Sequence, residues 1–235
     1  MIALSPAIQT AALDRDVSTA AVGRPIFFLI ALIAAASMIV GNFLALLQSN
    51  VKRILAYSSI AHIGYLLVAF LAAGRLAIET VTFYLITYFV STLGAFGVVT
   101  LLSRPDREAD PLDDYRGLFW RRPLLAGIFT AMLLSLAGLP LTAGFVGKFY
   151  IVAAGAASSL WALILILVLT SGVSIFYYLR VIVTLFSNID EAGPIPALPL
   201  LGRGVMILLA GLLLWLGTYP APIIRMVQTL ATTLG

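Results

Sequence analysis

The run SLAGLPLTAGFVGKFY, from Ser135 to Tyr150, decides how this chain folds. It lies in a longer stretch, from Pro123 to Leu179, in which Lys148 is the only charged residue. A bilayer core about 30 Å thick needs about 20 apolar residues of helix, so this stretch is long enough to cross a membrane twice. Residues that weaken a helix interrupt its first part. These are Gly138, Pro140, Gly144 and Gly147. The run therefore predicts a membrane helix that is broken near residues 138–147 and carries a lysine beside the break.

The composition of the whole chain agrees with a membrane protein. Of its 235 residues, 62% are hydrophobic and 10% are charged, and the mean hydropathy is +1.09. Soluble domains contain about 45–50% apolar and about 25% charged residues. The values here exclude a soluble enzyme, a disordered chain and a DNA-binding module, so no nucleic-acid partner is expected. With no cysteine, one histidine and no nucleotide-binding motif, the sequence predicts no metal-binding or cofactor-binding residues.

Six windows without Asp, Glu, Lys or Arg predict six transmembrane helices. Because these windows are continuously apolar and do not alternate, helices are favoured over strands. The expected fold is an all-α polytopic membrane protein, with an extramembrane segment at residues 1–24 and a membrane domain at residues 25–235. The six predicted spans are 26–48, 55–73, 79–102, 123–156 with its break, 160–187 and 204–224.

The distribution of Lys and Arg predicts the orientation of these spans. Ten of the 24 charges lie in one water-facing connection, residues 104–122, and a second loop covers residues 187–203. Cytoplasmic loops carry an excess of basic residues. Eight basic residues fall on one face: Lys52, Arg53, Arg104, Arg107, Arg116, Arg121, Arg122 and Arg203. Four fall on the other: Arg15, Arg24, Arg75 and Arg225. The first face is therefore predicted to be cytoplasmic, with both chain ends outside.

Lys148 is the leading candidate for a functional residue. An ionisable residue inside a membrane, beside a broken helix, predicts an ion or proton site. Burial also disfavours the ammonium form, which suits a group that exchanges protons. The alternative is a lysine that extends to the membrane surface. No acidic residue lies within a predicted span, so the sequence shows no counter-ion for Lys148.

His62, the only histidine, lies near the middle of its predicted span and heads a polar stripe that is suited to proton relay. The alternative is a structural histidine that bonds a neighbouring helix. Hydroxyl stripes in other spans either line a water file or form helix contacts. The candidates for lining are Ser58, Ser59, Tyr65, Tyr84, Thr87, Tyr88 and Ser174, while Ser91, Thr170 and Tyr177 share the same spacing. Asn42 is expected to serve in packing, and Trp161 and the Tyr177/Tyr178 pair in two interfacial belts.

Three runs carry a family resemblance. GNFLALLQSNVKRILAYSSIAHIGYLLVAF (Gly41–Phe70) resembles the KR-x-LAYSS-x-x-H-x-GY segment of subunit N of the proton-translocating NADH-quinone oxidoreductase, respiratory complex I. TFYLITYFVSTLGAFGVV (Thr82–Val99) resembles the helix that follows it. SLAGLPLTAGFVGKFYI (Ser135–Ile151) resembles the discontinuous helix of that antiporter-like family, which ends in a lysine. The three runs keep the order and spacing of the family.

The resemblance implies spans nine to fourteen of a fourteen-helix fold. Lys148 then matches the lysine of the broken twelfth helix, His62 matches the histidine of the tenth, and Tyr88 lies on the eleventh. It implies a proton-translocating subunit of the bacterial inner membrane with no redox centre of its own. NADH and quinone are used by the whole complex. The implied partners are other membrane subunits, including neighbouring antiporter-like subunits, and the lipid bilayer.

The chain departs from the family in one large respect, because counterparts of the first eight helices are absent from it. It is expected to be a fragment, one product of a split gene, with a separate chain carrying those helices, or a truncated paralogue. Two other functions stay open. One is a subunit of a multi-subunit cation/proton antiporter, which shares the fold. The other is a structural module that does not conduct protons.

Overall fold

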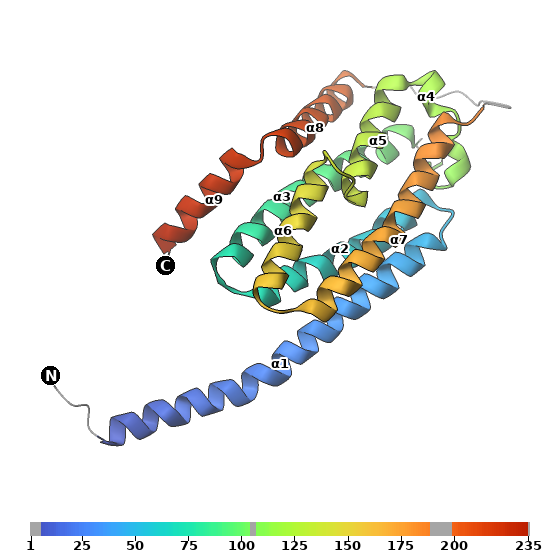
Figure 1. The fold of residues 1–235 in the computed structure, drawn as a ribbon. Helices are drawn as coiled ribbons and strands as arrows, with labels where there is room; N and C mark the ends of the chain where they lie inside the picture. Colours follow the sequence, from blue (N-terminus) through green and yellow to red (C-terminus); the bar gives the residue numbers. More distant parts are fainter. Residues whose placement is uncertain (1–5, 104–106, 189–198, 235) are drawn as a thin grey trace.

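The chain forms a bundle of membrane-length helices (Figure 1). The computed structural model describes the backbone of residues 6–103, 107–188 and 199–234. Within these ranges it describes the side chains of residues 23–229 except residue 75. Five of the described helices are long and apolar enough to cross a membrane, and two apolar helices are shorter. The prediction of an all-helical membrane protein is confirmed.

The long helices are α1 (Pro6–Leu46), α2 (Val51–Ala72), α3 (Gly74–Leu102), α7 (Trp161–Phe186) and α8 (Leu200–Thr218). The two shorter apolar helices are α5 (Pro123–Ala137) and α6 (Ala143–Ala157). A 3-10 helix, η1 (Leu112–Tyr115), and the single-turn α4 (Leu118–Arg121) lie in the connection after α3. The last helix is α9 (Ala221–Leu234).

The break predicted at residues 138–147 is shorter in the structure, because α5 ends at Ala137 and α6 begins at Ala143. Gly138, with φ of +78°, ends α5, and its amide donates to the carbonyl oxygens of Leu134 and Ser135. A positive φ is readily adopted only by glycine. The hydroxyl of Thr142 then accepts the amide of Phe145 and caps α6. Gly144 and Gly147 do not break the chain and lie inside α6.

Other predicted boundaries also differ from the helices. The predicted 204–224 span corresponds to α8, which ends at Thr218, and to α9, which continues to Leu234. Pro220 and Pro222 flank the start of α9, where a missing amide hydrogen is tolerated. At the start of the chain, residues 6–24 of the predicted extramembrane segment form the first part of α1. The apolar part of α1 begins at Gly23.

Successive spans run in alternating directions, and their connections come together at two ends of the bundle (Figure 1). The helices α5 and α6 run in the same direction as the two halves of one span, and α9 continues in the direction of α8. At one end, the amide of Val51 donates to the carbonyl of Asp110, and the amide of Gly117 donates to Thr184 near the end of α7. At the other end, the hydroxyl of Ser158 donates to the carbonyl of Ala72. By this alternation, the start of α1 and the end of α9 lie towards the second end, as Figure 1 shows.

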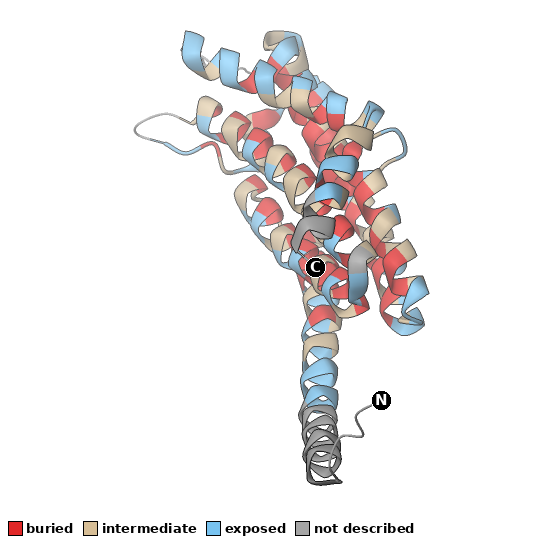
Figure 2. Cartoon of the chain, turned by 90° about the vertical axis from the view of Figure 1, so that its left-hand side faces the viewer, coloured by how far each residue is buried: buried red, intermediate tan, exposed pale blue. Residues whose placement is uncertain are grey.

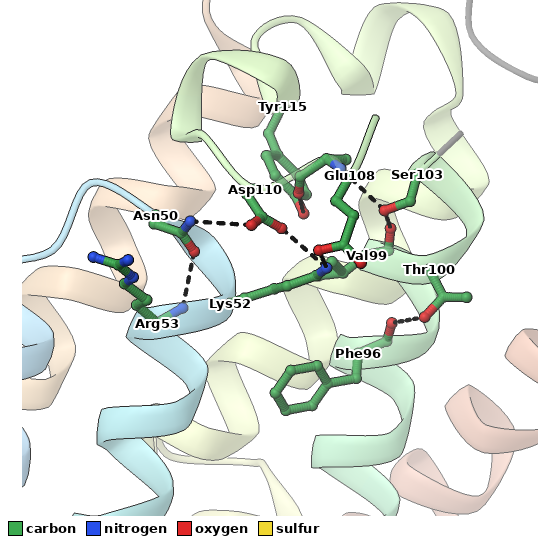
Figure 3. Close-up of polar contacts among 11 residues, drawn as sticks. Asn50, Lys52, Arg53, Phe96, Val99, Thr100, Ser103, Glu108, Asp110 and Tyr115 are labelled. Atoms are coloured by element: carbon green, nitrogen blue, oxygen red, sulfur yellow. Dashed lines mark hydrogen bonds and ion pairs between the residues drawn. The ribbon is translucent and has the colours of Figure 1, made fainter. Parts of the chain in front are cut away.

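Charged residues tie the connections together at the first end of the bundle. Lys52 pairs with Glu108 and lies 3.0 Å from Asp110, and Asn50 donates to the other oxygen of Asp110 (Figure 3). The side chain of Asn50 also caps α2 by accepting the amide of Arg53. Lys52, which was expected to set orientation, therefore also joins the start of α2 to the connection after α3.

Buried residues gather on the inner faces of the helices and exposed residues on the outer faces (Figure 2). Many of the exposed residues are large and apolar. Phe28, Phe176 and Leu201 are at least two-thirds exposed, which suits a surface that faces lipid. Close helix contacts depend on small residues. A Cβ on Gly41 would lie 2.7 Å from the backbone nitrogen of Ala61, so α1 and α2 touch through their backbones there.

Candidate functional site

Lys148 lies in the second turn of α6 and is only 6% exposed. Its Nζ donates to the carbonyl oxygen of Ala137 at 2.9 Å and to the hydroxyl of Ser171, on α7, at 2.8 Å. Ala137 is the last residue of α5, and the final carbonyls of a helix have no partner within the helix. The lysine therefore uses an acceptor that the helix break sets free, and its ammonium group lies in the protein interior.

The surroundings of Lys148 are polar but hold no negative charge among the described residues. Its hydrogen-bond acceptors are one carbonyl and one hydroxyl group. The aromatic ring of Tyr65, on α2, lies beneath it, with the ring centroid 5.1 Å from Nζ. Within the described part of the chain, neutral groups alone therefore hold this lysine.

His62 lies on α2 one turn before Tyr65 and is surrounded by tyrosines. Its Nδ1 is 2.7 Å from the hydroxyl oxygen of Tyr84, on α3. The ring of Tyr88 stacks on the imidazole with 5.0 Å between centroids, and Tyr65 meets it edge-on at 5.4 Å. Tyr65 therefore contacts both Lys148 and His62.

Tyr65 is itself held by two helices. Its hydroxyl accepts a hydrogen bond of 3.0 Å from the amide of Asn42, on α1, and Asn42 accepts another of 3.0 Å from the hydroxyl of Tyr177, on α7. All three side chains are fully buried. Tyr177 was expected in an interfacial belt, and this expectation is wrong, because Tyr177 and Tyr178 both lie in the core.

A small cavity, with several polar residues in its lining, lies next to His62 and reaches the helix break. It has room for about one water molecule. Its lining comprises His62, Tyr84, Thr87, Tyr88, Ser91, Ser135, Leu136 and Gly144. In the part of the chain that the structure describes, Nε2 of His62 and the hydroxyl of Thr87 are buried without a hydrogen-bond partner. These two atoms and the cavity are suited to hold a water molecule and to pass a proton.

The far wall of this cavity belongs to the break. The hydroxyl of Ser135, in the last turn of α5, accepts the amide of Gly144 at 3.1 Å and also the hydroxyl of Ser91 at 3.1 Å. A Cβ on Gly144 would collide with the carbonyl oxygen of Ser135. Ser135 thus bonds across the break and brings α3, α5 and α6 together.

Residues 11–174 match the model of a family described as NADH:quinone oxidoreductase/Mrp antiporter, TM. This chain belongs to that family. It is 52% identical over 222 residues to a protein named NADH-quinone oxidoreductase subunit N from Ectopseudomonas mendocina (strain ymp). The alignment covers 92% of this chain and 45% of that relative. The chain therefore spans about half the length of this relative of the NADH:quinone oxidoreductase/Mrp antiporter family.

Solved structures show the same family fold. One is a chain of respiratory complex I from Thermus thermophilus with bound aureothin, with a TM-score of 0.76 and 40% identity, over 84% of this chain and 44% of that one. Another is a chain of the Mrp complex from Dietzia sp. DQ12-45-1b, with a TM-score of 0.76 and 19% identity, over 86% of this chain and 46% of that one. The second likeness concerns the fold alone.

Most of the residues that the sequence predicts for the proton path and the helix break lie close together in the structure. His62, Tyr65, Tyr84, Thr87 and Tyr88 share one interior site with Lys148. The break glycines surround it: Gly138 packs on the Lys148 side chain, Gly147 packs on Tyr84, and Gly144 lines the cavity. Pro140 lies exposed in the break.

Three predicted lining residues use their hydroxyls within their own helices. Ser58 and Ser59 both donate to the carbonyl of Leu55, and Ser174 donates to the carbonyl of Ser171. The sequence reasoning missed Ser135 and Ser171. Ser171 carries a recognisable signal, because it lies three residues before Ser174 on the same helix face. Ser135 has no such signal in the sequence, since its role depends on the contact that α6 makes with it across the break.

Proposed function

We propose that this chain is part of the proton-translocating membrane subunit of an NADH-quinone oxidoreductase. In this proposal Lys148 and His62 carry protons, while the reduction of quinone by NADH takes place in other subunits. The chain supplies spans nine to fourteen of the antiporter-like fold and assembles with other membrane subunits. The 52% identity to a subunit N and the family match support this assignment.

One observation carries the proposal. Lys148 is buried at a helix break, where its Nζ bonds the free carbonyl of Ala137 and the hydroxyl of Ser171. Neutral acceptors stabilise a charged lysine less than a carboxylate does, so both the charged and the neutral form are accessible. The cavity beside His62 offers a place for a proton to move through a water molecule. Charge changes in neighbouring subunits would shift this balance and so couple to transport.

The deciding experiment replaces Lys148 by alanine in the assembled complex. Membrane vesicles that carry the complex are supplied with NADH, and the protons moved per NADH oxidised are measured beside quinone reduction. Lys148→Ala is expected to lower proton movement. The matched control is Phe149→Ala, since Phe149 is the next residue of α6 and is 62% exposed. Unchanged proton movement at normal assembly overturns the proposal. Loss of assembly with intact pumping in the fraction that assembles indicates a structural module.

A subunit of a cation/proton antiporter is the second candidate, because the family description names both complexes. The purified complex distinguishes them. Quinone reduction driven by NADH supports the first proposal, whereas sodium transport without quinone reduction supports the second.

We also propose that the end of the bundle with Lys52 and residues 107–122 faces the cytoplasm of a bacterial inner membrane, with both chain ends outside. Since the chain has no cysteine, single cysteines report orientation cleanly. Glu108→Cys and Ala157→Cys lie at opposite ends of the bundle and are exposed. A membrane-impermeant thiol reagent added outside intact cells is expected to label the second and not the first. The reverse pattern contradicts this orientation.

A further inference from the structure

The ammonium group of Lys148 has a side that its hydrogen bonds do not use. A charged lysine has three N–H donors and no acceptor. Two of them point to Ala137 and Ser171. The third is left for the face of Tyr65, whose centroid is 5.1 Å from Nζ, within the distance of a cation–π contact.

The charged and neutral forms of this lysine meet the ring differently. The face of an aromatic ring carries negative charge, so it attracts an ammonium group. A neutral amine has two N–H donors, which the carbonyl and the hydroxyl use, and its lone pair is then left towards the ring. Two regions of negative charge face each other in that form. The ring therefore favours the charged lysine.

The position of the ring is set from outside α2. Asn42, on α1, donates a hydrogen bond to the hydroxyl of Tyr65, and Tyr177, on α7, donates one to the side-chain oxygen of Asn42. The ring of Tyr65 is fully buried. A buried cation–π contact is stronger than an exposed one, because water does not compete for the cation. Close packing around the buried ring keeps its face beneath Nζ, and the hydrogen bond from Asn42 adds to this.

We propose that Tyr65 is the positioning residue that stabilises the charged form of Lys148 through the face of its ring. The proposal rests on the function proposed above. In it, the ring of Tyr65 takes the stabilising role that a carboxylate counter-ion would have beside Lys148. Around the lysine, α2 contributes the titratable groups His62 and Tyr65, and α3 contributes Tyr84, which packs on Gly147. The contacts from α5 and α7 are the neutral groups of Ala137 and Ser171.

The test is the dependence of proton pumping on pH in vesicles that carry the assembled complex. Pumping is expected to fall on the alkaline side, where Lys148 loses its proton. Tyr65→Leu removes the ring, and pentafluorophenylalanine at position 65 keeps its shape but removes the negative face. Both are expected to move the alkaline midpoint about one pH unit lower, a roughly tenfold change in the ratio of charged to neutral lysine. Tyr65→Phe keeps the buried ring and is expected to keep the wild-type midpoint, with a lower rate because Asn42 loses one of its hydrogen-bond partners.

Two controls separate this inference from the proposed function. Phe70→Leu makes a similar change on the same helix at a residue that is 63% exposed, and it is expected to leave the midpoint in place. If Lys148→Ala pumps normally, the proposed function fails. If Lys148→Ala stops pumping but all variants at position 65 share one midpoint, the proposed function stands and this inference is overturned. Should Tyr65→Leu fail to assemble, the comparison of phenylalanine with pentafluorophenylalanine decides alone.

Discussion

The Nζ atom of Lys148 lies 2.9 Å from the carbonyl oxygen of Ala137, so the side chain of α6 closes the gap that opens where α5 ends. Its aliphatic stem runs over Gly138, where a Cβ would lie 2.7 Å from Cδ of the lysine. The Lys148 side chain therefore packs directly on the break. A substitution of Lys148 or of Gly138 is expected to change this contact.

Ser171→Ala removes one of the two hydrogen-bond acceptors of Lys148. A hydrogen bond to a charged group contributes about 1.5–3 kcal/mol, so losing it is expected to lower proton pumping by roughly tenfold. Pumping per NADH oxidised measures the effect in the assembled complex. The control is Thr184→Ala on the same helix, whose hydroxyl donates to the carbonyl of Arg180 in its own helix. Equal pumping in both variants would count against a role for Ser171.

Gly144→Ala places a Cβ against the backbone of Ser135, which has little freedom to move. Overpacking of this kind destabilises by about 1–3 kcal/mol, so thermal unfolding in detergent is expected at a lower temperature. Gly127→Ala, on α5, is the matched control, because a Cβ there meets nothing within 4 Å. That variant is expected to be neutral or about 0.5–1 kcal/mol more stable, since glycine weakens a helix. A wild-type unfolding temperature for Gly144→Ala would contradict the close contact.

The helix break and its lysine are predictable because their cause is local. A glycine and a proline two residues apart end α5, and a charge in an apolar stretch stands out in the sequence. Tyr177 shows the opposite case. Its spacing from Trp161 suggested an interfacial position, but its hydroxyl bonds Asn42 in the core. An aromatic residue with a polar tip suits both places, and only the packing of α7 on α1 decides between them.

The partners of Lys52 were equally unpredictable. Its ion pairs join parts of the chain that are far apart in sequence, and they depend on how the connection after α3 folds back onto α2.

The boundary between α8 and α9 has a local signal in the sequence, because Pro220 and Pro222 lie there. The sequence does not reveal that α8 contacts the break between α5 and α6.

Gly217, near the end of α8, packs directly on the α5–α6 break. A Cβ on it would lie 2.9 Å from the backbone nitrogen of Ala143 and 3.3 Å from the carbonyl oxygen of Leu141. Gly217→Ala is therefore expected to push α8 away from the break and to lower both pumping and the unfolding temperature. Gly211→Ala, on the same helix with open space at its Cβ, is the control and is expected to raise the unfolding temperature slightly. If both variants behave alike, α8 does not support the break.

The last prediction concerns pH and the ion pair between Lys52 and Asp110. The hydrogen bond from Lys52 lowers the pKa of Asp110 below its usual value of 3.8. A carboxyl whose pKa is lower in the folded than in the unfolded chain binds fewer protons when folded. Its contribution to stability is therefore complete above about pH 4 and is lost as the pH falls through the lower, folded value.

Wild-type protein is accordingly expected to lose stability between about pH 4 and pH 2 more steeply than Asp110→Asn, which has no carboxyl to protonate. Asp110→Asn should be the less stable of the two at pH 7, because Lys52 then loses a charged partner. Thermal unfolding in detergent across this pH range measures the difference. Asp113→Asn is the control, since its pair with Arg116 is 3.6 Å long and mostly exposed, and such pairs contribute little. Parallel pH curves for wild type and Asp110→Asn would show that this ion pair does not stabilise the folded connection.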